Sequence, residues 1–256
     1  MEVILNINDL QYNNLWDSLS LSLEKGCFIA IAGSNNSGKS TLCRILDRKI
    51  IDNFNINLKG KDIKDYSLEE YNHSVQVVYP NECILVEETG EEELIRRNCL
   101  EERIEFFQKH KFLKTILSKE IEKMTIQEKI WLQMMIAVGK AEDLVVIDSI
   151  DSYLDKEDLK EAYTFLKACT KAFKISMIIM TLSLEATLLV DKLYIMKEGE
   201  MILEGDPLTI LQKDNLINKA GLKVPFMIDL SVKLRDYDLI KEIELEKEKL
   251  VEALWN

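Results

Sequence analysis

Apolar residues in this chain gather into short runs that polar turns separate. The run Phe28–Ala32 contains no polar residue, which predicts a short strand buried inside the protein. Beyond a polar loop, Leu42, Ile45 and Leu46 recur at the spacing of a helix. A second apolar run ends at Asp148 and predicts another buried strand. The pattern therefore predicts two interior strands, the first followed directly by a helix.

Residues 220–256 show helical spacing instead. Pro225 stands where a helix would begin, because its fixed φ suits the first turn. Two apolar stripes follow, which consist of Met227, Leu230 and Leu234 in the first segment and of Leu250, Val251 and Leu254 in the charged second segment. Both segments are predicted to be helices with one apolar side.

Length and composition limit the alternatives. The 256 residues, 47% of them hydrophobic, suffice for one large domain or for a domain with an appendage. No apolar run approaches the roughly 18–20 residues of a membrane span. The start MEVILNINDL carries an early glutamate and no basic segment, so no secretory signal is expected there. The net charge of −12 argues against a nucleic-acid partner, but it does not exclude one nucleotide in a local cradle.

The cysteines point to a reducing compartment. The five residues are scattered without C-x-x-C spacing, and they are Cys27, Cys43, Cys83, Cys99 and Cys169. An odd, scattered set predicts reduced thiols of a cytosolic protein, and it predicts neither a disulfide framework nor a zinc site.

The loop between the first strand and its helix carries a phosphate-binding motif. It matches G-x-x-x-x-G-K-[ST] in the strand–loop–helix context that the motif requires, and its residues are Gly33, Ser34, Asn35, Asn36, Ser37, Gly38, Lys39, Ser40 and Thr41. Glycines let backbone N–H groups surround phosphate oxygens at the positive end of a helix. Lys39 can reach the β- and γ-phosphates, and the Ser40 hydroxyl can ligate Mg²⁺. The alternative is a glycine turn that only caps a core helix.

Asp148 is predicted to complete this site. An aspartate at the end of a buried strand holds magnesium through water in P-loop proteins, and Ser40 is the other predicted metal ligand. Taken alone, Asp148 would be better explained as a cap of the turn that follows it, and it is the nearby phosphate loop that favours the metal role. The sequence therefore predicts a site for ATP and Mg²⁺.

The segment DSIDSYLD, residues 148–155, resembles the nucleotide-binding subunit of ABC transporters. In that family an aspartate is followed by a glutamate and then by a serine-x-leucine-aspartate loop, which Ser152 and Leu154-Asp155 match here. The stretch VDKLYIMKEGEMILEGDPLTIL, residues 190–211, resembles the last strands of that domain. The resemblance implies an α/β P-loop NTPase fold over residues 1–212, with a helical subdomain at about 81–130.

The segment AGLKVPFMIDLSVKLRDYDL, residues 220–239, resembles the C-terminal extension of the ATPase subunits of energy-coupling factor (ECF) transporters. It implies a C-terminal helical extension over residues 213–256. It also implies a second ABC ATPase subunit, either identical or different, and membrane T and substrate-binding S components. Such complexes import vitamins or metal ions and lie at the cytoplasmic face of the membrane, while the chain alone would be cytoplasmic.

Four motifs of the family have changed in this chain. Ser149 stands where the family has its glutamate, and Leu182 stands where it has the switch histidine. Tyr79-Pro80-Asn81 replaces the glutamine that couples nucleotide and membrane partner. The leucine-serine-glycine-glycine-glutamine signature becomes MTIQE, residues 124–128, and residues 91–138 contain no glycine. No family catalytic residue is therefore intact.

These changes predict weak or absent hydrolysis. Serine cannot hold a proton near neutral pH, and losing a positioned acid/base group typically costs about 10²–10⁴ in rate. Thr125 and Glu128 keep a T-x-x-E capping box, so the helix that begins at the signature is still expected. Gln127 carries a side chain where glycine would bare the backbone, and Glu128 adds a negative charge unless it points away from phosphate.

The acidic run, Tyr12 and the function of the whole chain keep more than one interpretation. The acidic run Glu91–Glu93 after Thr89 is either a capping box at a helix start or a face on which a basic helix of the membrane partner docks. Tyr12 is either an adenine-stacking residue, as the resemblance implies, or an ordinary strand tyrosine. For the whole chain, the alternatives to a degenerate transporter ATPase are a non-hydrolytic, nucleotide-gated assembly subunit and a soluble ABC protein.

Overall fold

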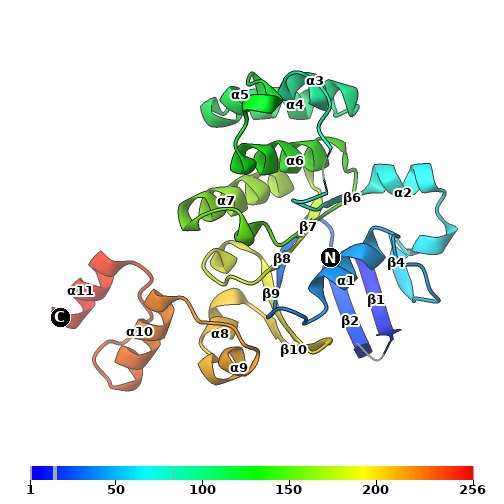
Figure 1. Ribbon diagram of the computed structural model, residues 1–256. Helices are drawn as coiled ribbons and strands as arrows, with labels where there is room; N and C mark the ends of the chain where they lie inside the picture. The colour runs from blue at the N-terminus through cyan, green and yellow to red at the C-terminus, as the bar shows by residue number, and fades with distance from the viewer. Residues whose placement is uncertain (1, 14–15, 83, 256) are drawn as a thin grey trace.

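The computed structural model describes residues 2–13, 16–82 and 84–255, together with every side chain in these ranges except that of Asp17. Two β-sheets form the centre of the molecule, and helices cover the larger sheet (Figure 1). The described cysteines are free thiols, and Cys83, which the sequence analysis grouped with them, lies outside the described residues. No helix in the described part of the chain has the length and apolar character needed to cross a membrane.

The larger sheet has the strand order β10-β9-β3-β8-β7-β6. Neighbouring strands are parallel except for the antiparallel pair β9–β10. The strands are β3 (Phe28–Ala32), β6 (Val75–Val78), β7 (Leu144–Asp148), β8 (Ser176–Thr181), β9 (Lys192–Lys197) and β10 (Glu200–Gly205). Because β3, β7 and β8 run in parallel, their carboxyl ends meet at one edge of the sheet.

The smaller sheet is antiparallel and has the order β2-β1-β4-β5. Its strands are β1 (Val3–Tyr12), β2 (Trp16–Glu24), β4 (Ile56–Leu58) and β5 (Lys61–Asp62). It packs against one face of the larger sheet, where Ile29 and Ile31 of β3 join its core. Phe28, Ala30 and Ala32 point to the other face and pack with α6 and α7. Both faces of β3 are thus covered, which explains why its sequence is apolar at every position.

Helices occupy three regions of the chain. Near the phosphate loop and the smaller sheet lie α1 (Lys39–Leu46) and α2 (Leu68–Ser74). The helical layer contains α3 (Gly90–Arg96), α4 (Glu101–Gln108), α5 (Lys111–Leu117) and α6 (Ile126–Lys140), and α7 (Lys156–Phe173) follows β7. The C-terminal part contains α8 (Pro207–Leu211), α9 (Asp214–Lys219), α10 (Phe226–Asp236) and α11 (Lys247–Trp255). Short 3₁₀ turns lie at Ile63–Asp65, Ile121–Lys123, Ile150–Ser152 and Thr187–Leu189.

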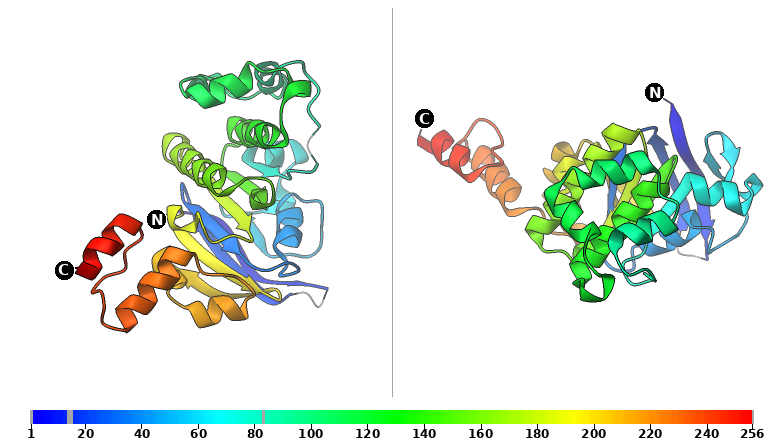
Figure 2. Two further views of the ribbon diagram at one scale, coloured as in Figure 1. Left: turned by 60° about the vertical axis from the view of Figure 1, so that its left-hand side comes forward. Right: turned by 90° about the horizontal axis from the view of Figure 1, so that it is seen from above.

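Several local predictions are confirmed. The strand at Phe28–Ala32 and the helix after it form as expected, and α10 begins directly after Pro225. The helical layer reaches from α3 to Lys140, whereas the sequence placed it at about residues 81–130. The last two helices project to one side of the sheets (Figure 2), and α10 packs on the main core through Ile228.

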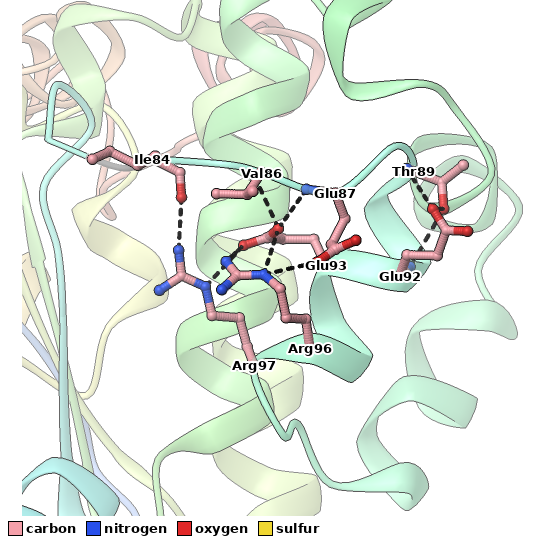
Figure 3. A network of polar contacts seen from close by, with 8 residues as sticks. All are labelled: Ile84, Val86, Glu87, Thr89, Glu92, Glu93, Arg96 and Arg97. Carbon is pink, nitrogen blue, oxygen red and sulfur yellow. Dashed lines mark hydrogen bonds and ion pairs between the residues drawn. The ribbon is translucent and has the colours of Figure 1, made fainter.

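The acidic run forms the start of α3 and is largely structural (Figure 3). Glu92 makes the predicted capping box with Thr89. Glu93 is fully buried and accepts hydrogen bonds from the N–H groups of Val86 and Glu87, each at 3.1 Å, and from Arg96 and Arg97. The capping interpretation is therefore confirmed, and the Glu93 carboxylate does not face a partner.

Candidate nucleotide-binding site

The phosphate loop lies at the carboxyl edge of the larger sheet, between β3 and α1. Helix α1 begins after Gly38 without any side-chain cap and with no acidic residue in its first turn. Its first N–H groups and the positive end of its dipole are thus available to an anion. An unblocked helix start beside a glycine loop is the arrangement that binds phosphate groups.

Two glycines of the loop are required by their surroundings. A Cβ at Gly33 would lie 2.4 Å from the carbonyl oxygen of Met196 and 2.6 Å from the Ser37 hydroxyl oxygen. Gly38 has φ +109°, and a Cβ there would lie 2.4 Å from Nε1 of Trp16. Both positions therefore exclude larger residues, and Gly38 in addition adopts a backbone conformation that favours glycine.

Lys39 lies folded into the loop. Its ammonium donates to the carbonyl oxygens of Gly33 and Ser34 at 2.6 and 2.9 Å, and to the Ser37 hydroxyl at 3.2 Å. Burial lowers the pKa of Lys39, and the charges of Asp151 and Asp148 oppose that effect. The amine is held beside the cradle by neutral acceptors, from which it can turn to a bound phosphate.

A cavity of about 290 Å³ opens at this edge of the sheet. Its wall brings together parts of the chain that are far apart in sequence: Asn35, Asn36, Ser37, Gly38, Lys39, Ser40, Thr41, Ser149 and Leu182. Gly33 and Ser34 lie behind it and hold Lys39. Ser149 and Leu182, which the resemblance assigns to the family's glutamate and histidine positions, thus face the phosphate loop.

The donor set fits a magnesium ion that arrives with a nucleotide. The described residues contain no group of three or more His, Cys, Asp or Glu side chains that could hold a metal by itself. Magnesium usually needs only one or two protein ligands beside phosphates and waters. The exposed Ser40 on the cavity wall and Asp148 at the end of β7 can supply them.

Ser149 occupies a strained position that its surroundings fix. Its φ of 50° and ψ of 52° are left-handed. Its hydroxyl donates to Oδ1 of Asp148 at 3.0 Å, and its N–H donates to the carbonyl oxygen of Met180 at 3.0 Å. Ser149 therefore presents a hydroxyl, and not a carboxylate base, to the cavity.

The altered signature still begins a helix. Thr125 and Glu128 form the predicted capping box at the start of α6. The Glu128 carboxylate is paired with the Lys119 ammonium at 2.7 and 2.9 Å, so its charge is compensated within the chain. Ile126, which follows Thr125 at the start of this helix, is 65% exposed.

Tyr12 lies apart from the lining of the cavity. Its half-buried ring packs 6.1 Å from the Trp16 ring and 5.9 Å from the Phe54 ring, measured between centroids. The adenine-stacking role remains a prediction, because this arrangement equally suits an aromatic cluster at the end of β1.

Two residues of the site were missed by the sequence analysis. Trp16 is buried, and its Nε1 touches the phosphate loop at Gly38. Asp151 accepts a hydrogen bond at 2.8 Å from the N–H of Leu182, across the cavity edge. A carboxylate in the turn after β7 was a visible signal for Asp151, whereas no sequence pattern links Trp16 to a loop some twenty residues later.

The sheet order, the loop geometry and the cavity define this chain as a P-loop nucleotide-binding protein. The sequence profile of the ABC transporter family matches residues 16–151, more than half of the chain, and the protein belongs to that family. The helical layer and the two sheets agree with the fold of solved ATP-binding subunits of ABC transporters.

Proteins with similar sequences or structures include ATP-binding subunits of energy-coupling factor and related ABC transporters. The chain is 26% identical to the energy-coupling factor transporter ATP-binding protein EcfA1 of Geobacillus kaustophilus, over 99% of this chain and 97% of that protein. It is 27% identical to EcfA1 of Bacillus subtilis, over 93% and 89%. The structure of CbiO1 from Clostridium perfringens, part of the ABC transporter complex CbiONQ, matches with a TM-score of 0.73 at 22% identity, covering 90% of this chain and 99% of that one.

Proposed function

We propose that this chain is the ATP-binding subunit of an ECF-type importer, with weakened or lost hydrolysis of its own. The observation that carries the proposal is one cavity in which a complete phosphate loop faces Ser149 and Leu182. The loop supports binding of Mg-ATP, whereas the opposite wall lacks a base and a histidine. The ECF names of relatives that match nearly end to end support the transporter assignment.

Binding is tested by calorimetry with Mg-ATP. Lys39→Ala removes the ammonium beside the cradle and should weaken binding at least about tenfold, the scale of one charge-assisted hydrogen bond to phosphate. Lys25→Ala is the matched control, because Lys25 pairs with Glu2 at 3.6 Å and precedes β3 at its opposite end. Equal affinities of the wild type and Lys39→Ala would refute the site.

Residual turnover is expected to depend on a partner subunit. In the family each ATP lies between one subunit's phosphate loop and the other's signature. A homodimer would combine Ser149, Leu182 and residues 124–128 at both sites, so neither site would turn over well. In a heterodimer, an orthodox partner's own glutamate would act at the site that meets residues 124–128, where only contacts are lost.

Phosphate release by the purified complex shows which subunit supplies the catalytic base. Ser149→Ala in this chain should change the rate little, whereas removal of the partner's glutamate should abolish it. Brisk hydrolysis by this chain alone would contradict the proposal.

A membrane T component is proposed to dock in a cleft between the sheets and the helical layer. A cavity of about 340 Å³ lies there, and its lining includes Tyr79 at the altered glutamine position, Ile84, Arg97 and Gln133 of α6. Ile84 is 74% exposed at its rim, and such an apolar side chain is typical of an interface centre. This location would put the chain at the cytoplasmic face of the membrane.

Ile84→Asp should reduce co-purification with the native membrane partners. Ile51→Asp is the matched control, since Ile51 is 72% exposed but does not line the cleft. The acidic run is a poor target for such a test, because charge reversal of the buried Glu93 would disrupt α3 itself. If both variants retain the partners equally, docking occurs elsewhere, and if no S or T component co-purifies, the importer assignment fails.

A non-hydrolytic, nucleotide-gated assembly subunit is the second candidate. The apolar Leu182 side chain on the cavity wall favours it, because no acid/base group faces the phosphate loop there. Complete absence of turnover in the complex, with nucleotide still required for assembly, would support this candidate over a slow ATPase. The transported substrate is chosen by another subunit in either case.

A further inference from the structure

On the wall of the phosphate cavity opposite the loop, the polar hydrogens of the lining residues already form hydrogen bonds within the protein. The N–H of Ser149 donates to the Met180 carbonyl oxygen, and its hydroxyl donates to Asp148. The N–H of Leu182 donates to Oδ2 of Asp151, and the side chain of Leu182 has no polar atom. Ser149 and Leu182, the lining residues on this side, therefore offer a terminal phosphate no uncommitted N–H or O–H.

Asp151 makes the bond that closes this wall. It lies in the turn Ile150–Ser152 after β7, while Leu182 follows β8, so the bond joins the ends of two neighbouring strands. A carboxylate that accepts from a backbone N–H makes a charge-assisted bond, which is stronger than a neutral one. This contact fixes where the segment of residues 181–183 lies relative to the cavity.

The surroundings of Asp151 show that its carboxylate is confined. Its Oδ1 is buried and has no hydrogen-bond partner among the described residues, and the same holds for the hydroxyl of Tyr163. Burial raises the pKa of Asp151, although the bond from Leu182 opposes this shift. Its charge also interacts with Lys39 and with Tyr163. The group thus lies close to both Tyr163 of α7 and Lys39 of the phosphate loop.

We propose that Asp151 is a positioning residue that fastens residues 181–183 to the turn after β7, and that the fastened site binds ADP and ATP with similar affinity. This inference rests on the proposed nucleotide binding. Lys39 of the loop can contact the β-phosphate of ADP as well as the γ-phosphate of ATP, so donors on the opposite wall decide a preference for ATP, and the fastened wall provides none.

The experiment compares dissociation constants for Mg-ATP and Mg-ADP by calorimetry. For the wild type the two constants should agree within about threefold, which is less than 1 kcal/mol. Asp151→Ala frees the N–H of Leu182 and should shift the ratio toward ATP by about fivefold or more. Asp151→Asn keeps an oxygen that accepts from Leu182 and removes the charge, so it should retain the wild-type ratio.

Ser183→Ala is the matched control, because it alters the same segment and leaves the Asp151–Leu182 bond intact. It should behave as the wild type. Should Asp151→Ala fail to fold, Asp151→Ser removes the long acceptor while it keeps a polar side chain, and it should give the same shift.

The outcomes distinguish this inference from the proposed function. If the wild type binds neither nucleotide, the proposed function fails and the inference fails with it. A preference of the wild type for ATP of about tenfold or more leaves nucleotide binding intact and overturns the inference alone. Equal shifts in Asp151→Ala and Asp151→Asn would show that charge, and not the bond to Leu182, controls the ratio, which also overturns it.

Discussion

The Glu93 carboxylate accepts a hydrogen bond from Nε of Arg97 at 2.8 Å and ties the first helix of the helical layer to the loop before it. Arg97 also donates to the carbonyl oxygen of Ile84 at 2.7 Å, so the pair reaches the rim of the proposed docking cleft. Because Ile84 and Arg97 both line that cleft, the pair helps to fix its shape, while the Glu93 carboxylate itself is buried.

Glu93→Gln is expected to destabilise the protein by about 3 kcal/mol, because it leaves two arginines facing a buried group that no longer carries charge. Urea unfolding followed by circular dichroism measures the change. Glu92→Gln is the control, since an amide can keep the capping contact to Thr89 and should cost about 0.5 kcal/mol or less. Equal effects of the two variants would contradict the structural role of Glu93.

The same carboxylate gives the protein a defined acid sensitivity. Burial by itself would raise the pKa of Glu93, but hydrogen bonds from Arg96, Arg97 and the loop N–H groups outweigh it and lower the pKa to about 2. A lowered folded-state pKa means that the contribution is complete above the ordinary value of 4.5 and is lost as pH falls toward 2. The stability difference between the wild type and Glu93→Gln should therefore shrink across this window.

Gly38→Ala should abolish measurable nucleotide binding and lower the free energy of unfolding by about 1–3 kcal/mol. The alanine would adopt φ near +109° and place its Cβ against Nε1 of Trp16. Gly60→Ala is a close control, because Gly60 also has positive φ, +76°, but has open space around it. Calorimetry and thermal melting of both variants separate the contact with Trp16 from backbone strain.

Trp16 should report nucleotide binding through its fluorescence. Its buried indole touches the phosphate loop, so phosphate charge close by is expected to shift its emission. Trp16→Phe should remove the response to Mg-ATP, whereas Trp255→Phe at the exposed C-terminal helix should retain it. The Trp16 variant breaks no hydrogen bond, since Nε1 has no partner among the described residues, but it loses packing of a buried ring, so circular dichroism must show that it is folded. A response that persists in Trp16→Phe would place the signal elsewhere.

Thr125→Ala should destabilise the protein by about 1 kcal/mol through loss of the cap on α6. Thr115→Ala is the control, because that exposed hydroxyl bonds only the preceding turn of α5. Denaturant unfolding compares the two variants. If Thr125→Ala remains folded under assay conditions and partner-dependent hydrolysis still falls, the altered signature contributes to the interface between subunits.

The sequence by itself determined the elements whose evidence is local. The strand at Phe28–Ala32, the loop and helix after it, and the capping boxes at Thr89 and Thr125 follow from short-range pattern and backbone chemistry. The resemblance to the ABC family added the global fold, which the matching family and structures confirm. The roles of the site residues remain predictions, because they depend on a bound nucleotide.

Only the tertiary structure decided which distant residues meet. Parallel pairing of β3, β7 and β8 brings the phosphate loop, Ser149 and Leu182 to one edge, and the pairing of β1 with β2 places Trp16 against Gly38. Glu93 is buried whereas Glu91 and Glu92 are not, although the three look alike in sequence. Hydrogen bonds and desolvation act through space, so no spacing along the chain could assign Asp151 to Leu182 or Glu93 to the loop before α3.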